Sequence, residues 1–128
     1  MRILLDTHIV IWAMVGSKHL SPKARRILED GENEFLLSSA SLWEIALKHA
    51  ANPDGMPVST WLVQSYCLDS GIHQLPVTFL HAAHTETLPP IHGDPFDRML
   101  VAQAMCEGLA LLTHDDNIVR YGKFAIRC

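Results

Sequence analysis

The chain has 128 residues with a formal net charge of −4, and 48% of its residues are hydrophobic while 19% are charged. This composition is typical of a globular protein and excludes a collagen, a coiled coil or a largely disordered chain. No apolar run approaches the roughly 20 residues that span a bilayer, and the apolar start is too short for a signal-peptide core. We therefore expect a cytoplasmic protein without a membrane partner, built as one domain over residues 1–128.

The net negative charge excludes a protein that holds nucleic acid by overall charge, because such proteins are usually basic. A polyanionic partner would need a local basic patch or a bound metal. Two groups of basic residues are interpreted either as phosphate contacts or as solvated surface: Lys18, Lys23, Arg25 and Arg26, then Arg120, Lys123 and Arg127. The three cysteines are too widely spaced for a disulfide framework or a zinc knuckle.

Short apolar strands alternate with helices along the chain, which predicts a parallel sheet covered on both faces. Helix caps and stops such as Ser21-Pro22, Gly71 and Gly108 mark the boundaries. In chain order we expect a strand over 3–5, helices over 7–15 and 22–29, a strand over 34–38, helices over 39–50 and 57–69, a strand over 73–76, helices over 78–87 and 95–107, and strands over 109–113 and 124–126.

Four acidic residues stand in places where a carboxylate is costly. Asp6 and Asp115 follow the first and fourth expected strands, at the sheet edge where open α/β folds bind ligands. Glu44 and Asp97 lie within strongly apolar helical stretches. Carboxylates that converge beside a core repel one another, and a divalent cation removes that repulsion. Ligands that are all oxygen favour Mg²⁺ or Mn²⁺ over zinc.

Each acid also has a purely structural interpretation. Ser41 and Glu44 fit a capping box, and Glu44 is spaced from Lys48 as a helical ion pair. Asp94 before a proline is a natural helix N-cap, which would place Asp97 in the first turn. Asp6 can cap the following helix, and Asp115 or Asp116 can begin a turn. Spacing alone leaves both interpretations open.

Four blocks of the chain stand out together. The first holds Asp-Thr-His at 6–8 and the second Ser-Leu-Trp-Glu-Ile at 41–45. The third, over 92–104, holds Asp-Pro-Phe-Asp-Arg, and the fourth spans 111–115 and is followed by Tyr121. Together the four blocks resemble the PIN domain family, in the branch of VapC-type toxins. They stand in that family's order, and the pairing of the second block with the third is specific.

The resemblance implies a three-layer α/β/α PIN-like domain with a central parallel sheet of four to five strands. It also implies a Mg²⁺- or Mn²⁺-dependent endoribonuclease that hydrolyses RNA phosphodiester bonds, as the toxin of a toxin–antitoxin pair. By motif position, the residues for catalysis and metal binding are Asp6, Glu44, Asp97 and Asp115. A cognate antitoxin and a homodimer are the implied protein partners. The alternative is a PIN-like binding module that has lost catalysis.

The resemblance leaves several neighbouring positions open. Asp94 matches an extra acid beside the third block, and Asp116 is an alternative to Asp115. Thr7 and Thr113 match small hydroxyl positions that orient acids. The loop over 50–58 departs from related chains, which leaves room for a role in substrate choice or partner contacts.

Other polar and aromatic residues have mainly structural interpretations. Arg98 is expected to contact a phosphate or to pair with a carboxylate. His81 and His84 have a spacing that can hold a metal, but an exposed helix face is the favoured interpretation. Trp12 and Trp43 are expected in the core rather than as nucleic-acid stacking platforms, because their neighbours are apolar.

Overall fold

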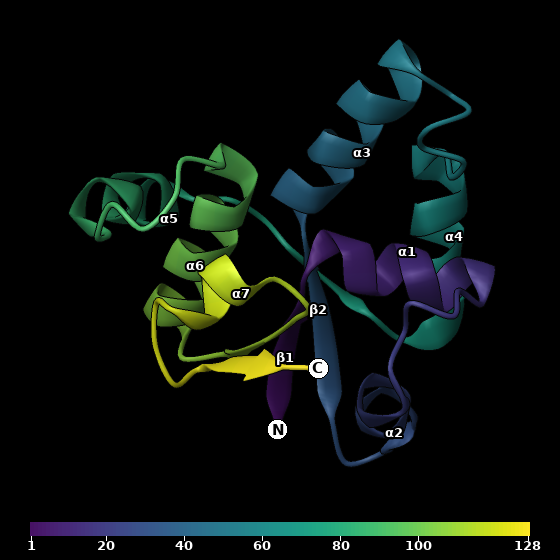
Figure 1. Cartoon of the computed structure of the whole chain (residues 1–128), viewed down its shortest axis with the longest axis horizontal. Coiled ribbons are helices and arrows are strands. Elements are labelled where there is room, and N and C mark those ends of the chain that lie inside the picture. The colour runs from purple at the N-terminus through teal and green to yellow at the C-terminus, as the bar shows by residue number, and fades with distance from the viewer.

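The computed structural model describes all 128 residues. They form a parallel sheet that lies between two layers of helices. The strands are β1 (Arg2–Leu5), β2 (Glu34–Ser38), β3 (His73–Leu75), β4 (Ala110–Thr113) and β5 (Ala125–Arg127). The helices are α1 (Thr7–Val15), α2 (Pro22–Glu29), α3 (Ser39–Ala51), α4 (Thr60–Ser70), α5 (Phe79–His84), the 3₁₀ turn η1 (Thr85–Thr87), α6 (Pro95–Glu107) and α7 (Asp116–Val119). The predicted three-layer α/β/α fold is confirmed (Figure 1).

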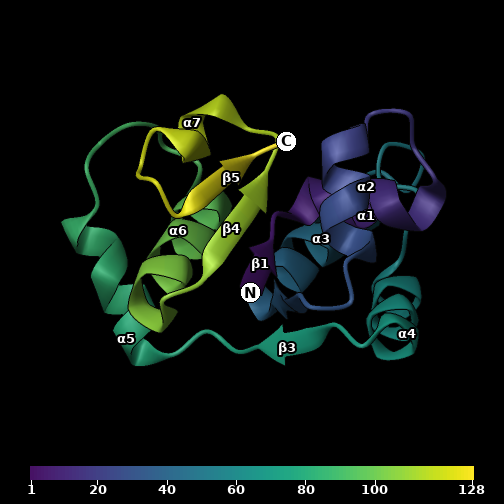
Figure 2. The ribbon, with the colours of Figure 1, turned by 90° about the horizontal axis from the view of Figure 1, so that it is seen from below.

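The five strands are all parallel and lie in the order β3-β2-β1-β4-β5. Strands β3 and β5 are the two edge strands of this sheet, and both can be followed in Figure 2. Strand β1 therefore lies at the centre, between β2 and β4. Its register places Leu4 beside Leu36 on one side and beside Leu111 on the other.

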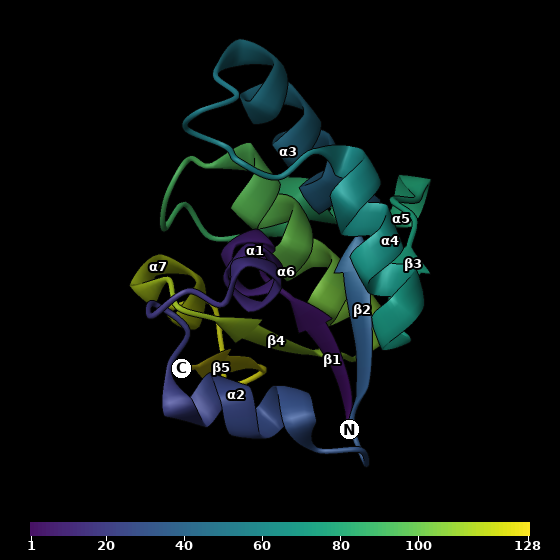
Figure 3. The same cartoon turned by 90° about the vertical axis from the view of Figure 1, so that its right-hand side faces the viewer.

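Alternate residues of the central strands enter two separate cores, because successive side chains of a strand point to opposite faces. Leu4 and Leu111 pack with the apolar side of α6, whereas Ile3 and Leu112 pack with residues of α1 and α2. A third cluster joins α1, α3 and α4 through Val10, among others. Figures 1 and 3 show α5–α7 on one side of the sheet and α1, α2 and α4 on the other.

Helix ends follow the signals in the sequence. Ser21 caps α2 by accepting a hydrogen bond from the backbone N–H of Ala24, and proline occupies the first turn. Helices α1, α4 and α6 end at Gly16, Gly71 and Gly108, whose positive φ values of 65°, 71° and 64° suit glycine. None of these helices is long and apolar enough to cross a membrane.

Three helical segments differ from expectation. Helix α4 begins at Thr60 rather than at 57, because Ser59 is its cap and Val58 is buried in the core ahead of it. The expected helix over 78–87 narrows into η1 after His84, where the Thr85 and Thr87 hydroxyls donate to backbone carbonyls. A short helix, α7, forms where only a turn was expected.

Candidate active site

The four predicted site acids meet at the carboxyl-terminal edge of the sheet. Asp6 directly follows β1, and Asp115 follows β4, its neighbour. Glu44 lies in α3, the helix that directly follows β2, and Asp97 lies in the first turn of α6. The charges of Asp6, Glu44 and Asp115 all act on Asp97 and raise its pKa. The expected convergence of the four acids is therefore present in the structure.

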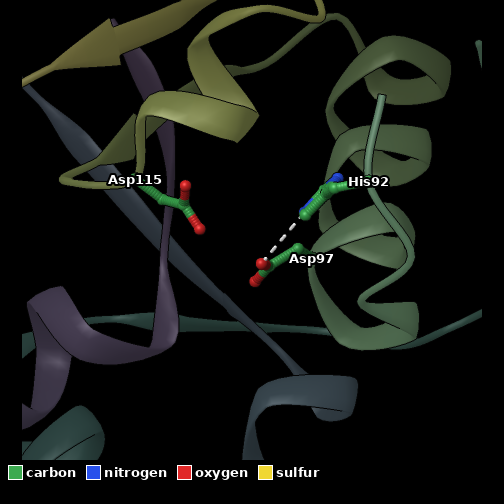
Figure 4. A group of neighbouring side chains, drawn as sticks. All are labelled: His92, Asp97 and Asp115. Atoms are coloured by element: carbon green, nitrogen blue, oxygen red, sulfur yellow. Dashed lines mark hydrogen bonds and ion pairs between the residues drawn. The ribbon is translucent and has the colours of Figure 1, made fainter. Parts of the chain in front are cut away.

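The tightest part of the site joins two of these acids to a histidine. One ligand atom from each of His92, Asp97 and Asp115 lies within 4.8 Å of the others. Figure 4 shows the three side chains facing one another from the loop before α6, the first turn of α6 and the segment after β4. Asp6 and Glu44 lie outside this group, where each has a partner of its own.

Asp6 is buried and held by a threonine of the neighbouring strand. Its Oδ2 accepts a 2.7 Å hydrogen bond from Thr113 Oγ1, which also accepts one from the Asp115 backbone N–H at 3.0 Å. Burial raises the pKa of Asp6; the Thr113 bond and His8 lower it, and Asp115 is among the charges that raise it further. Thr113 thus has the predicted orienting geometry, whereas Thr7 donates to Ser41 Oγ.

Glu44 forms an ion pair within its own helix. Its side chain is buried, and Oε2 accepts a 2.6 Å hydrogen bond from Lys48 Nζ, which raises the pKa of the lysine. The capping-box interpretation is wrong, because α3 is capped by Ser38, one turn earlier, through a bond from the Ala40 backbone N–H. The helical ion-pair interpretation is confirmed, and this pair sets a positive charge beside the acids.

The pKa of the Asp97 carboxyl group is strongly raised by its surroundings. Burial, followed by the charges of Asp6, Asp94, Asp115 and Glu44, raises its pKa to about 8. Asp94 is the N-cap of α6, with 2.9 and 3.1 Å bonds from the backbone N–H groups of Phe96 and Asp97. Asp94 is therefore both a cap and a contributor to the negative field at Asp97.

Asp116 is separate from the site. It pairs with Arg127 at 2.7 Å, its side chain is 85% exposed, and the arginine lowers its pKa. Asp115 instead points toward His92 and Asp97 (Figure 4). Of these two adjacent acids, only Asp115 belongs to the cluster.

The donor set fits a divalent cation. Asp6 and Asp97 have raised pKa values because they are buried among other carboxylates. A bound cation would offset the repulsion among these groups and favour their ionised forms. Oxygen ligands with at most one imidazole are the ligands of a hard or borderline divalent ion.

Two residues of the third block have roles in the structure that the sequence did not predict. His92 opens the third block, and its ring binds Asp97 on one side and Tyr121 on the other. Arg98 has a different role from the two expected: its guanidinium donates to the Tyr121 hydroxyl and to four backbone carbonyls between Thr85 and His92. The sequence signal for these hydrogen bonds was the concentration of polar residues at the start of the third block.

Two expectations about burial are wrong. Trp43 is 62% exposed and meets Phe96 edge to face, at the rim of an apolar cavity of about 420 Å³ beside the site. His81 is 1% exposed, because its ring caps α5 and bonds Glu107 at 2.8 Å. In both cases the local sequence shows a helix face, and only the packing of the neighbouring helices decides which face is covered.

The basic residues near the termini are partly engaged in bonds within the chain. Lys23 Nζ donates to the Arg127 backbone carbonyl at 2.8 Å, and Arg25 donates to the Ser17 carbonyl. These contacts join α2 to β5 and to the turn before α2. They favour the interpretation of this group as surface structure.

Comparison with known proteins identifies the family of the chain. The family model described as PIN domain matches residues 3–124. The chain is 30% identical to ribonuclease VapC22 of Mycobacterium tuberculosis over 116 residues, covering 88% of this chain and 86% of that protein. The chain therefore belongs to the PIN domain family.

Solved structures share the fold at lower sequence identity. VapBC2 from Rickettsia felis, bound to a promoter DNA fragment, superposes with a TM-score of 0.72 at 16% identity, over 99% of this chain and 97% of that one. The sarcin-ricin loop cleaving toxin VapC20 of Mycobacterium tuberculosis gives 0.64 at 18%, over 98% and 99%. At these identities the likeness establishes the fold.

Proposed function

We propose that this protein is a metal-dependent endoribonuclease and the toxin of a toxin–antitoxin pair. The observation that carries the proposal is the convergence of Asp6, Glu44, Asp97 and Asp115 at one sheet edge, with the pKa of Asp97 raised to about 8. The relationship to a VapC ribonuclease supports RNA as the substrate.

Asp6, Asp97 and Asp115 would hold the cation, Mg²⁺ or Mn²⁺, with Glu44 as the fourth acid of the site. Such a cation, when bound, offsets the charge of a phosphodiester and activates water for its hydrolysis. The protein's own contribution is positional: Thr113 fixes Asp6 and the backbone of Asp115. Lys48 compensates the charge of Glu44. This division of roles explains how a chain with net negative charge can accept a polyanion.

The proposed protein partners are a cognate antitoxin and a second copy of the chain. Among the structural neighbours are a toxin–antitoxin complex from Klebsiella pneumoniae and the Rickettsia felis VapBC2 complex, which support an antitoxin here. A homodimer is supported by exposed apolar side chains: Trp43, which lines the cavity, is 62% exposed, and Phe79, at the start of α5, is 95% exposed. Sedimentation of wild type and Phe79→Asp tests it, and a monomeric wild type would contradict it.

The loop over 50–58 is a candidate for substrate or antitoxin contacts. Met56 and Val58 anchor it in the core, and His49 Nδ1 lies 2.6 Å from the Met56 carbonyl oxygen. The exposed residues that precede these anchors, over 52–55, are the part that a partner can reach.

The decisive experiment is cleavage of a pool of structured RNAs by purified protein with Mg²⁺, Mn²⁺ or EDTA. We expect cleavage that requires the metal and disappears in Asp6→Asn and Asp97→Asn. Asp116→Asn is the matched control, because it removes an acid that lies outside the cluster. A folded, antitoxin-free wild type that cuts no RNA with either metal would instead support the inactive binding module.

A further inference from the structure

His92 is bonded through both nitrogens of its ring. Nδ1 lies 2.9 Å from the Tyr121 hydroxyl, and Nε2 lies 3.2 Å from Asp97 Oδ2. The side chains of His92 and Asp97 are only 13% and 15% exposed. The imidazole therefore connects the acidic site to the segment after α7, with little access for solvent.

Arg98 sets the direction of these hydrogen bonds. A guanidinium can only donate, so the 2.9 Å contact from Arg98 Nη1 makes the Tyr121 oxygen an acceptor. The Tyr121 hydroxyl then has its own hydrogen free to donate to His92 Nδ1. With Nδ1 as the acceptor, the neutral ring carries its hydrogen on Nε2, which donates to Asp97.

We propose that His92 is a positioning residue: the Arg98–Tyr121 pair fixes its Nε2–H tautomer, and this N–H holds Asp97 in the orientation that binds the cation. The inference rests on the proposed function and adds a residue to it. One carboxylate oxygen of Asp97 accepts the hydrogen bond from His92, and the other oxygen is left to bind the cation (Figure 4).

The competing role for His92 is direct ligation, since its ring lies within 4.8 Å of ligand atoms of Asp97 and Asp115. The two roles exclude each other at one atom, because Nε2 cannot carry a hydrogen and coordinate a cation at the same time. The hydrogen bond from Arg98 to Tyr121 favours Nε2 as a hydrogen-bond donor rather than as a metal ligand. Partners that orient ligating carboxylates in this way typically contribute about 10–100-fold to metal affinity.

The tautomer is measured by long-range ¹H–¹⁵N NMR on metal-free protein. We expect the His92 pattern of a neutral ring protonated at Nε2. In Tyr121→Phe the donor to Nδ1 is lost, and the two ¹⁵N shifts should move toward each other as the tautomers mix. A wild-type ring protonated at Nδ1, or a pattern unchanged in Tyr121→Phe, would overturn the proposal.

Mn²⁺ binding by calorimetry, without RNA, tests the consequence for the site. His92→Phe removes both ring bonds and should weaken binding by about 10-fold or more. His92→Gln keeps a donor near the position of Nε2 and should bind more like wild type. His73→Phe is the matched control, because this histidine lies on the edge strand β3 and contacts only Glu34 among charged groups.

The variants separate positioning from ligation and from folding. His92→Gln that binds as weakly as a folded His92→Phe, or His92→Phe that binds as tightly as wild type, would contradict a positioning donor. Thermal melting identifies any variant that fails to fold, in which case Tyr121→Phe carries the test. If the tautomer and Mn²⁺ results hold while wild type cuts no RNA, the proposed ribonuclease activity fails and the His92 role stands.

Discussion

Asp97→Asn should stabilise the metal-free protein, and increasingly so as the pH rises. The folded chain holds the pKa of Asp97 at about 8, against 3.8 for an ordinary aspartate, because the carboxylate is buried among other acids. Between these values the folded state binds a proton that the unfolded state has released. The stability of the wild type therefore falls from about pH 4 to about pH 8 and then levels off. Asparagine removes this dependence and still accepts the bond from His92.

The magnitude follows from the pKa difference. If the whole difference acted on folding, it would correspond to roughly 5–6 kcal/mol at about 1.4 kcal/mol for each tenfold change in proton affinity. Solvent screening and the linked protonation of neighbouring acids reduce it, and we expect about 1–3 kcal/mol above pH 8. For a chain of this length that corresponds to a rise in Tm of roughly 4–10 °C.

The assay is thermal unfolding in EDTA at about pH 5, 7 and 9, followed by circular dichroism. Added Mn²⁺ should reduce the difference in Tm between Asp97→Asn and the wild type at high pH, because it should stabilise the wild type alone by binding to its folded state. Asp116→Asn is the control, because Arg127 lowers the pKa of that exposed acid and its removal gives no gain at high pH. An Asp97→Asn protein that melts below wild type at about pH 9 would refute the reasoning: the charge would then be stabilising.

Three further substitutions test the supports of the site. Thr113→Val should lower the free energy of unfolding by about 1–3 kcal/mol in urea titrations, since it leaves the buried Asp6 without its donor; an unchanged stability would contradict this. Arg98→Lys should lower the free energy of unfolding by about 2 kcal/mol and speed proteolysis of the loop before α6, because an ammonium cannot replace a planar guanidinium that donates to five acceptors. Equal proteolysis rates would argue against this role. His81→Phe should lower the free energy of unfolding by about 1–3 kcal/mol, because the Thr78 backbone N–H loses its acceptor. The folded variant should keep full RNA cleavage, and a loss of cleavage would mean that α5 affects the site.

The elements and the acids were predictable because their signals are local. Strands, helix caps and glycine stops depend on residues within a few positions of one another, and most boundaries fell where the sequence placed them. The meeting of Asp6 with Asp115 was predictable too, since parallel strands end at one edge. Glu44 and Asp97 stood out as acids within apolar helical stretches, but only the resemblance to the PIN domain family grouped them with Asp6 and Asp115, because spacing alone could not.

The tertiary structure decided what depends on contacts between distant segments. Only the packing of the helices against one another shows that Trp43 is exposed and His81 buried, because each helix presents more than one apolar or polar face. The bonds that join His92 to Tyr121 and Arg98 to the loop cross up to 29 positions of the chain, beyond any local periodicity. The structure likewise separates the two adjacent acids: Asp115 lies beside His92 and Asp97, whereas Asp116 pairs with Arg127.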